Sequence, residues 1–182
     1  MPLFLFVIAA LCAVNAPRVR TVLAPTPEAT AVAALGAAIS AAVLALFAVL
    51  ADPLLDLVHI SSPSFRIATG LLLLATGILA FGGPGPTPDP ALPGRRAALV
   101  PVAFPTLLTP GVAALTVSGS VDHSAPCAFV VAAVALATLP LLVATAPESP
   151  VRRRVLDGLA RVLAGVLVIA ALGLLMDGVF DI

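Results

Sequence analysis

The chain has 182 residues and no formal net charge; 61% of its residues are apolar and only 10% are charged. A soluble domain carries about 25% charged residues, so a soluble fold and a disordered chain are both excluded. We therefore expect an all-α membrane protein whose partner is the lipid bilayer, with room for about six spans of about 20 residues each. Because no basic patch is present, we expect no binding to nucleic acid.

Six apolar segments follow one another, separated by connecting segments rich in Pro, Gly and Ser. The segment at Leu3–Val14 also resembles the apolar region of a signal peptide, but no basic residue precedes it, so we interpret it as the start of the first span. The longest connecting segment, residues 83–96, contains five prolines and cannot form a helix. The predicted spans are about residues 3–23, 30–50, 64–82, 97–119, 126–146 and 155–176.

The charges fall on two sides if these spans alternate in direction. One side holds Arg18, Arg20, Arg95, Arg96, Arg152, Arg153 and Arg154. The other side holds Asp52, Asp56, His59, Arg66, Asp122, His123, Asp177 and Asp181. The positive-inside rule then predicts that the arginine-rich side faces the cytoplasm of a bacterial plasma membrane and that both termini lie outside.

The chain contains a diverged internal repeat. Arg66 and Gly70 form the pattern R-x-x-x-G before an aliphatic run, and Arg161 and Gly165 form it again in the last predicted span. The repeat divides one membrane domain into residues 1–82 and 97–182, joined by a cytoplasmic linker at 83–96. Because each half has three spans, the halves must enter the membrane from opposite sides, which is the inverted repeat of many transporters.

Two of the predicted spans are interrupted at equivalent places. Asn15-Ala16-Pro17 ends the short apolar run of the first span, and Thr109-Pro110-Gly111 interrupts the fourth. Proline removes a backbone donor and clashes with the preceding turn, so both helices are predicted to break near the bilayer midplane. Freed backbone groups are tolerated there only when they face protein or water, which predicts a binding site between the breaks. Two kinks that only shape packing are the alternative.

These motifs resemble those of the MarC family of bacterial inner-membrane proteins over nearly the whole chain. The run His59–Leu71, HISSPSFRIATGL, is similar to the family pattern G-I-S-x-P-x-x-R-I-A-G-G-L, and Val100–Pro105 is similar to V-P-L-A-x-P. Thr109-Pro110-Gly111 stands where the family has G-P-G, and Asp177-Gly178 fits its terminal N-G. The resemblance implies six spans and a relationship to small-solute exporters and amino-acid transporters.

The chain departs from the family pattern beside the interruptions, at Ala16, Thr69 and Thr109, and by carrying Arg18 and Arg20. An intramembrane arginine would suit an anionic group, unless both side chains extend to the lipid headgroups. The candidate substrate-binding residues are Asn15, Pro17, Arg18, Arg20, Thr69, Thr109, Pro110 and Gly111.

Two carboxylate–arginine pairs, Asp56 with Arg66 and Asp157 with Arg161, are predicted as structural or gating ion pairs. Asp122, His123 and Asp177 would suit a metal or a proton relay, but their spacing fits a solvated loop better. We therefore expect no metal, and no motif indicates a cofactor.

The sequence favours a transporter or exporter of a small polar or anionic, amino-acid-like solute held between two discontinuous helices. The alternative is a membrane-embedded enzyme using the same cavity, for example for nitrite-dependent N–N bond formation (diazotisation) in an actinobacterial natural-product pathway. Such chemistry would need a dry site. The small residues Gly36, Ala37, Ser40 and Ala41 would allow close packing within the chain or in a homo-oligomer.

Overall fold

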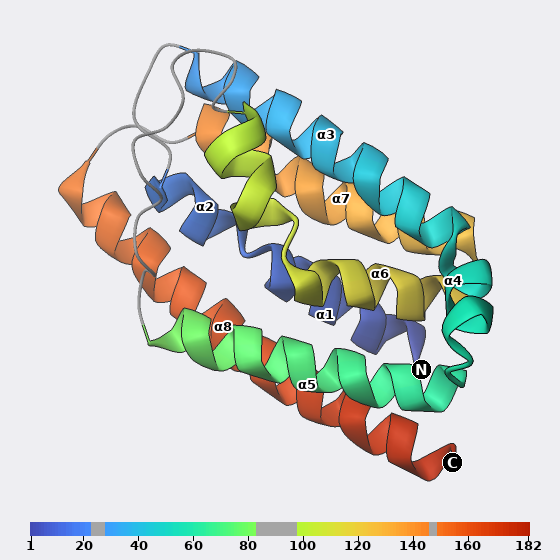
Figure 1. Ribbon diagram of the computed structural model, residues 1–182. Helices are drawn as coiled ribbons and strands as arrows, with labels where there is room; N and C mark the ends of the chain where they lie inside the picture. Colours follow the sequence, from blue (N-terminus) through green and yellow to red (C-terminus); the bar gives the residue numbers. More distant parts are fainter. Residues whose placement is uncertain (23–27, 83–97, 146–148) are drawn as a thin grey trace.

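The structure is a computed structural model that describes residues 1–22, 28–82, 98–145 and 149–182, and these residues form helices and no strand (Figure 1). Four of the helices are long and apolar enough to cross a membrane. They are α3 (Ala29–Val49), α5 (Ser62–Phe81), α7 (Ala125–Ala144) and α8 (Pro150–Phe180). The expected class, an all-helical protein with apolar spans, is therefore confirmed, and the predicted linker at 83–96 lies outside the described residues.

The shorter elements lie between two pairs of long helices. Helix α3 packs along α7, and α5 packs along α8. Figure 1 shows α1 (Leu3–Val14), α2 (Ala16–Val22) and α6 (Pro110–His123) in the layer between these pairs. Both labelled ends of the chain lie at the same end of the molecule.

Helix α6 follows an irregular π-helical segment, η2 (Leu99–Leu107). Within η2 the backbone is extended at Val100 (φ −132°, ψ 118°) and at Phe104 (φ −117°, ψ 129°). Each of these residues precedes a proline, and the proline ring disfavours helical backbone in the residue before it. The prolines therefore explain why this stretch cannot form a regular helix.

Three boundaries differ from the predicted ones. The short helix α4 (Ala51–Val58) was not expected. It can form because Pro53 lies in its first turn, where proline is tolerated. Helix α8 begins at Pro150 rather than near residue 155, since Ser149 accepts a hydrogen bond from the backbone N–H of Arg152. Helix α6 continues to His123, beyond the predicted end of the fourth segment.

Small residues bring the backbones of α5 and α8 together at three levels. A Cβ atom added to Gly70 would lie 3.1 Å from the carbonyl oxygen of Ala171, and one added to Gly77 would lie 3.2 Å from that of Ala164. One added to Gly178 would lie 3.1 Å from the carbonyl oxygen of Pro63. The contacts recur every seven residues on both helices, so the two helices run antiparallel with close backbone approach along their shared length.

The predicted small-residue face of α3 is used inside the chain. A Cβ atom added to Gly36 would lie 3.1 Å from the carbonyl oxygen of Ala98, beside Val102 of η2. Ser40 is fully buried and donates to the carbonyl oxygen of Gly36 at 2.9 Å. This part of the face therefore packs α3 against η2.

Candidate functional site

The junction between α1 and α2 consists of one residue, Asn15. Its backbone has φ 42° and ψ 55°, a left-handed conformation that Asn tolerates better than most residues. Its side chain is 6% exposed, and its Nδ2 donates a hydrogen bond of 3.1 Å to the carbonyl oxygen of Ala160 on α8. Its buried Oδ1 has no hydrogen-bond partner in the part of the chain that the structure describes. The junction thus presents a fixed, buried polar group.

Thr109 begins α6. Its Oγ1 accepts a hydrogen bond from the backbone N–H of Val112 at 3.2 Å, and Pro110 occupies the first turn, where its missing N–H costs nothing. Gly111 lies against α5, where an added Cβ would be 3.2 Å from Oγ1 of Thr76. This local chemistry explains why a regular helix restarts here after η2.

Replacing Thr109 by Val is expected to lower the free energy of unfolding by about 1 kcal/mol, because the α6 cap is lost while the side-chain shape is kept. Chemical unfolding of the purified protein in detergent would measure this change. Thr145→Val is the matched control, since Thr145 is exposed at the end of α7 and caps no helix start. Equal effects of the two substitutions would contradict the capping role.

The remaining predicted site residues are spread over α2 and α5. Pro17 is buried in the first turn of α2, and Arg18 beside it is half-buried. Arg20 also lies on α2, but its side chain is outside the described part of the structure. Thr69 of α5 is fully buried, and its Oγ1 donates to the carbonyl oxygen of Ala114 on α6 at 3.5 Å. Thr69 therefore joins α5 to α6.

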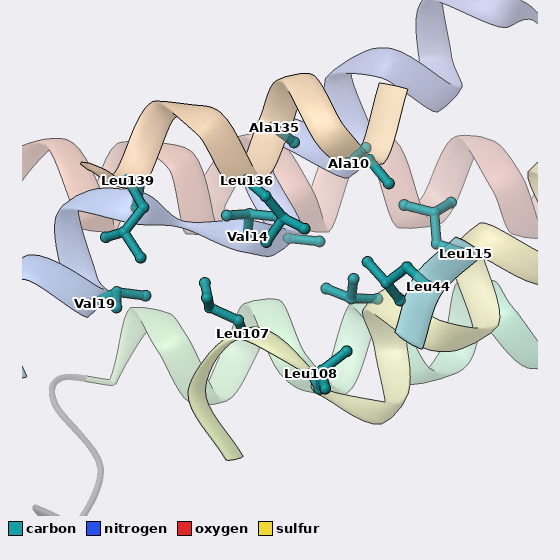
Figure 2. Close-up of a cluster of buried hydrophobic side chains, with 14 of the residues drawn as sticks. Ala10, Val14, Val19, Leu44, Leu107, Leu108, Leu115, Ala135, Leu136 and Leu139 are labelled. Carbon is teal, nitrogen blue, oxygen red and sulfur yellow. The ribbon is translucent and has the colours of Figure 1, made fainter. Parts of the chain in front are cut away.

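Apolar side chains fill the layer around the two interruptions (Figure 2). They come from α1 and α2, from the end of η2, and from α3, α6 and α7. The buried members that Figure 2 labels are Ala10, Val14, Val19, Leu44, Leu107, Leu108, Leu115, Ala135, Leu136 and Leu139. Leu107 and Leu139 are 0% exposed. The interruptions are thus embedded in a closely packed apolar cluster.

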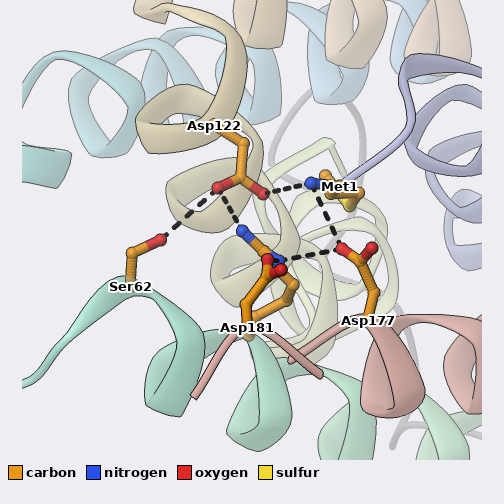
Figure 3. Close-up of polar contacts among 6 residues, drawn as sticks. Met1, Ser62, Asp122, Asp177 and Asp181 are labelled. Atoms are coloured by element: carbon orange, nitrogen blue, oxygen red, sulfur yellow. Dashed lines mark hydrogen bonds and ion pairs between the residues drawn. The ribbon is translucent and has the colours of Figure 1, made fainter. Parts of the chain in front are cut away.

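A second polar centre lies where the described ends of α5, α6 and α8 meet (Figure 3). Arg66 of α5 is 6% exposed at its side chain and forms ion pairs with three carboxylates. Its Nη2 is 2.7 Å from Oδ1 of Asp122 on α6, and its Nη1 is 2.8 Å from Oδ2 of Asp177 on α8 and also contacts Asp181, the residue directly after α8. We call these four residues the Arg66 network.

Two more groups border the Arg66 network. Ser62 donates to Oδ1 of Asp122 at 3.4 Å, and the amino group of Met1 is 3.2 Å from Oδ2 of Asp177. The ring centroids of His123 and Phe6 are 5.9 Å apart. Nε2 of His123 is buried and has no hydrogen-bond partner among the described residues. No group of three or more His, Cys, Asp or Glu side chains among residues 1–22, 28–82, 98–145 and 149–182 is arranged to hold a metal ion.

Neither of the two predicted ion pairs is found among the described residues. Asp56 is exposed on α4, where Leu55 forms the buried face, so Arg66 pairs with α6 and α8 instead. Asp157 and Arg161 are both exposed on α8, and within the described ranges they form no ion pair. Sequence reasoning missed the Arg66 network because its partners are distant in the chain. Their common place on one predicted side of the membrane was the available signal.

A comparison with protein families gives one match over residues 3–182, to the family described as MarC family integral membrane protein. No curated protein and no solved structure gives a significant match. The match agrees with the resemblance seen in the motifs and covers both polar centres, the Asn15 junction and the Arg66 network.

Proposed function

Because the chain belongs to the MarC family of integral membrane proteins, we propose that it transports a small polar or anionic, amino-acid-like solute across the bacterial plasma membrane. In this proposal α1 with α2, and η2 with α6, form two discontinuous spans, which with the four long helices give six crossings. Residues 1–82 and 97–182 are the inverted halves, and the linker at 83–96 lies in the cytoplasm. Both termini lie outside.

The observation that carries this proposal is the placement of the short elements. The helices that end at Val14 and begin at Pro110 lie between the pair α3 and α7 and the pair α5 and α8. Interrupted backbone inside a bilayer must be shielded from lipid by protein or face a water-filled cavity. Placement of both interruptions in the middle layer satisfies this requirement, and solute sites of transporters are built at such positions.

The two polar centres would have separate roles. The Asn15 junction and the neighbouring α2, which carries Arg18 and Arg20, would contact the solute, with an arginine facing its negative group. The Arg66 network would close the outer end, because it joins α5 of the first half to α6 and α8 of the second. The apolar cluster around Leu107 would close the route on the other side of the solute, so the packed structure corresponds to a closed state.

The experiment is uptake by liposomes that contain the purified protein. We expect them to accumulate at least one labelled amino acid or small carboxylate faster than protein-free liposomes. Arg18→Gln is expected to reduce uptake of an anionic solute at least tenfold, since a charge-assisted pair is lost. Arg161→Gln is the matched control, because Arg161 is exposed on α8 and should leave uptake unchanged.

Uptake equal to that of protein-free liposomes for the whole panel would contradict a transporter. Consumption of nitrite and an amine by the protein in detergent, with no membrane gradient, would favour the membrane-embedded enzyme instead. The two proposals are therefore separated by whether a sealed compartment is needed.

A further inference from the structure

The carbonyl oxygen of the Asn15 side chain is an acceptor that the fold leaves unused. Oδ1 is buried and has no hydrogen-bond partner within residues 1–22, 28–82, 98–145 and 149–182, and Asn15 is only 6% exposed. A buried polar atom without a partner loses its hydration with no compensating bond, and native proteins contain few of them. Such an atom is therefore available to accept a hydrogen bond from a bound ligand.

The orientation of this amide is fixed by its other end. Nδ2 lies 3.1 Å from the carbonyl oxygen of Ala160, which can only accept a hydrogen bond. Turning the amide over would place two acceptors against each other, so the free end must be the oxygen. The single-residue junction and the bond to α8 hold this oxygen in place before any ligand arrives, which reduces the entropy lost on binding.

The surroundings of the oxygen also favour a donor. Asn15 stands between the carbonyl end of α1 and the amide end of α2, so the opposed helix dipoles largely offset each other there and the side-chain oxygen sets the local preference. Val14, Ala16 and Val19, which lie near Asn15 in the chain, are buried and apolar, and a hydrogen bond is stronger in such a dry region. A lone anion such as acetate or nitrite has no N–H group to donate, and the partial negative charge of the Asn15 oxygen would repel it.

We propose that Oδ1 of Asn15 accepts a hydrogen bond from an ammonium or other N–H group of the solute, so that the protein selects amine-bearing solutes over anions that lack a donor. This inference rests on the proposed function and deepens it by naming the recognised group. An amino acid has both an N–H donor for Asn15 and a negative group for the arginines of α2. Its ammonium group would bind Asn15 while its carboxylate faces the basic α2.

The test uses three related probes and the purified full chain. For each small amino acid that raises the unfolding temperature in detergent, its N-trimethyl and desamino counterparts are compared with it. We expect at least tenfold weaker binding for both, because neither carries the ammonium N–H groups. Equal binding of the N-trimethyl compound, stabilisation by desamino acids alone, or no stabilisation by any amino acid would overturn the inference.

Asn15→Gly gives a second, independent arm. Glycine adopts the left-handed backbone of this junction readily, so the variant removes the amide while keeping the turn. Amino-acid binding is expected to fall at least tenfold. Ser40→Ala is the control and should leave binding unchanged, because it removes a buried hydroxyl that donates to a carbonyl of its own helix. If Asn15→Gly fails to fold, the comparison of probes on the unaltered protein still decides.

The outcome also separates this inference from the proposed function. Amino acids that bind through Asn15 but do not enter liposomes would support the binding site and contradict transport. Solutes that are transported equally well by Asn15→Gly would support transport and contradict the binding site. Stabilisation by sodium ions in the absence of any amine would assign the oxygen to a metal cation and overturn the proposal.

Discussion

Replacing Arg66 by Met is expected to lower the free energy of unfolding by about 3–5 kcal/mol, because removal of the guanidinium takes away the nearest counter-charge of the buried Asp122 carboxylate. The Arg66 side chain is 6% exposed, and Asp122 is 7% exposed. Burial of this kind removes most of the water that could stabilise the remaining negative charge. Chemical unfolding in detergent, followed by the loss of helical circular dichroism, would measure the change.

The control is Arg161→Met, which alters the corresponding arginine of the predicted internal repeat. Arg161 is exposed on α8, so its replacement should leave stability nearly unchanged. Within the Arg66 network, Asp122→Asn should destabilise more than Asp181→Asn, since the Asp181 side chain is 51% exposed and can be hydrated. Equal effects at Arg66 and Arg161 would mean that the network is not formed in the membrane protein.

Replacing Gly70 by Ala is expected to destabilise the protein by about 1–3 kcal/mol, because the added methyl group overpacks the contact between α5 and α8. The new Cβ would lie 2.7 Å from Cγ of Leu175 and 3.1 Å from the backbone oxygen of Ala171. A side chain can rotate away, but the backbone oxygen cannot move without separating the helices. Unfolding measured under the same conditions as for Arg66→Met would detect the loss.

Gly158→Ala is the matched control and should change stability in the opposite direction. An added Cβ at Gly158 meets nothing within 4 Å. The same substitution there improves helix propensity, which raises stability by up to about 1 kcal/mol. Loss of stability at both glycines would show that the effect at Gly70 does not come from helix contact.

The sequence was sufficient for features that depend on local chemistry. Apolar content predicted the membrane class, and the third predicted span, residues 64–82, overlaps α5 (Ser62–Phe81) closely. The fourth predicted span was expected to be interrupted at Thr109-Pro110-Gly111, and the regular helix α6 begins there, at Pro110. The family, too, was recognisable from its motifs and is confirmed. Six crossings and the inverted repeat stay predictions.

Features that depend on tertiary packing were not predictable in the same way. The sequence paired Arg66 with the nearby Asp56, whereas the structure pairs it with Asp122, Asp177 and Asp181. Which carboxylate reaches an arginine depends on how helices pack, and apolar periodicity says little about that when lipid covers their outer faces. The sequence also could not predict that Oδ1 of Asn15 lacks a hydrogen-bond partner among the described residues, because this depends on which groups pack around it.

The close approach of α5 to α8 restricts how this protein can change shape. Sliding one helix along the other would drive Gly70 and Gly77 against the backbone carbonyls of the facing helix before a new register was reached. The two helices should therefore move together as one rigid body, and rearrangement should occur where α1, α2 and α6 face them. Spin labels on the outer faces of α5 and α8 would keep a constant separation through every functional state, while labels on α6 would shift against both.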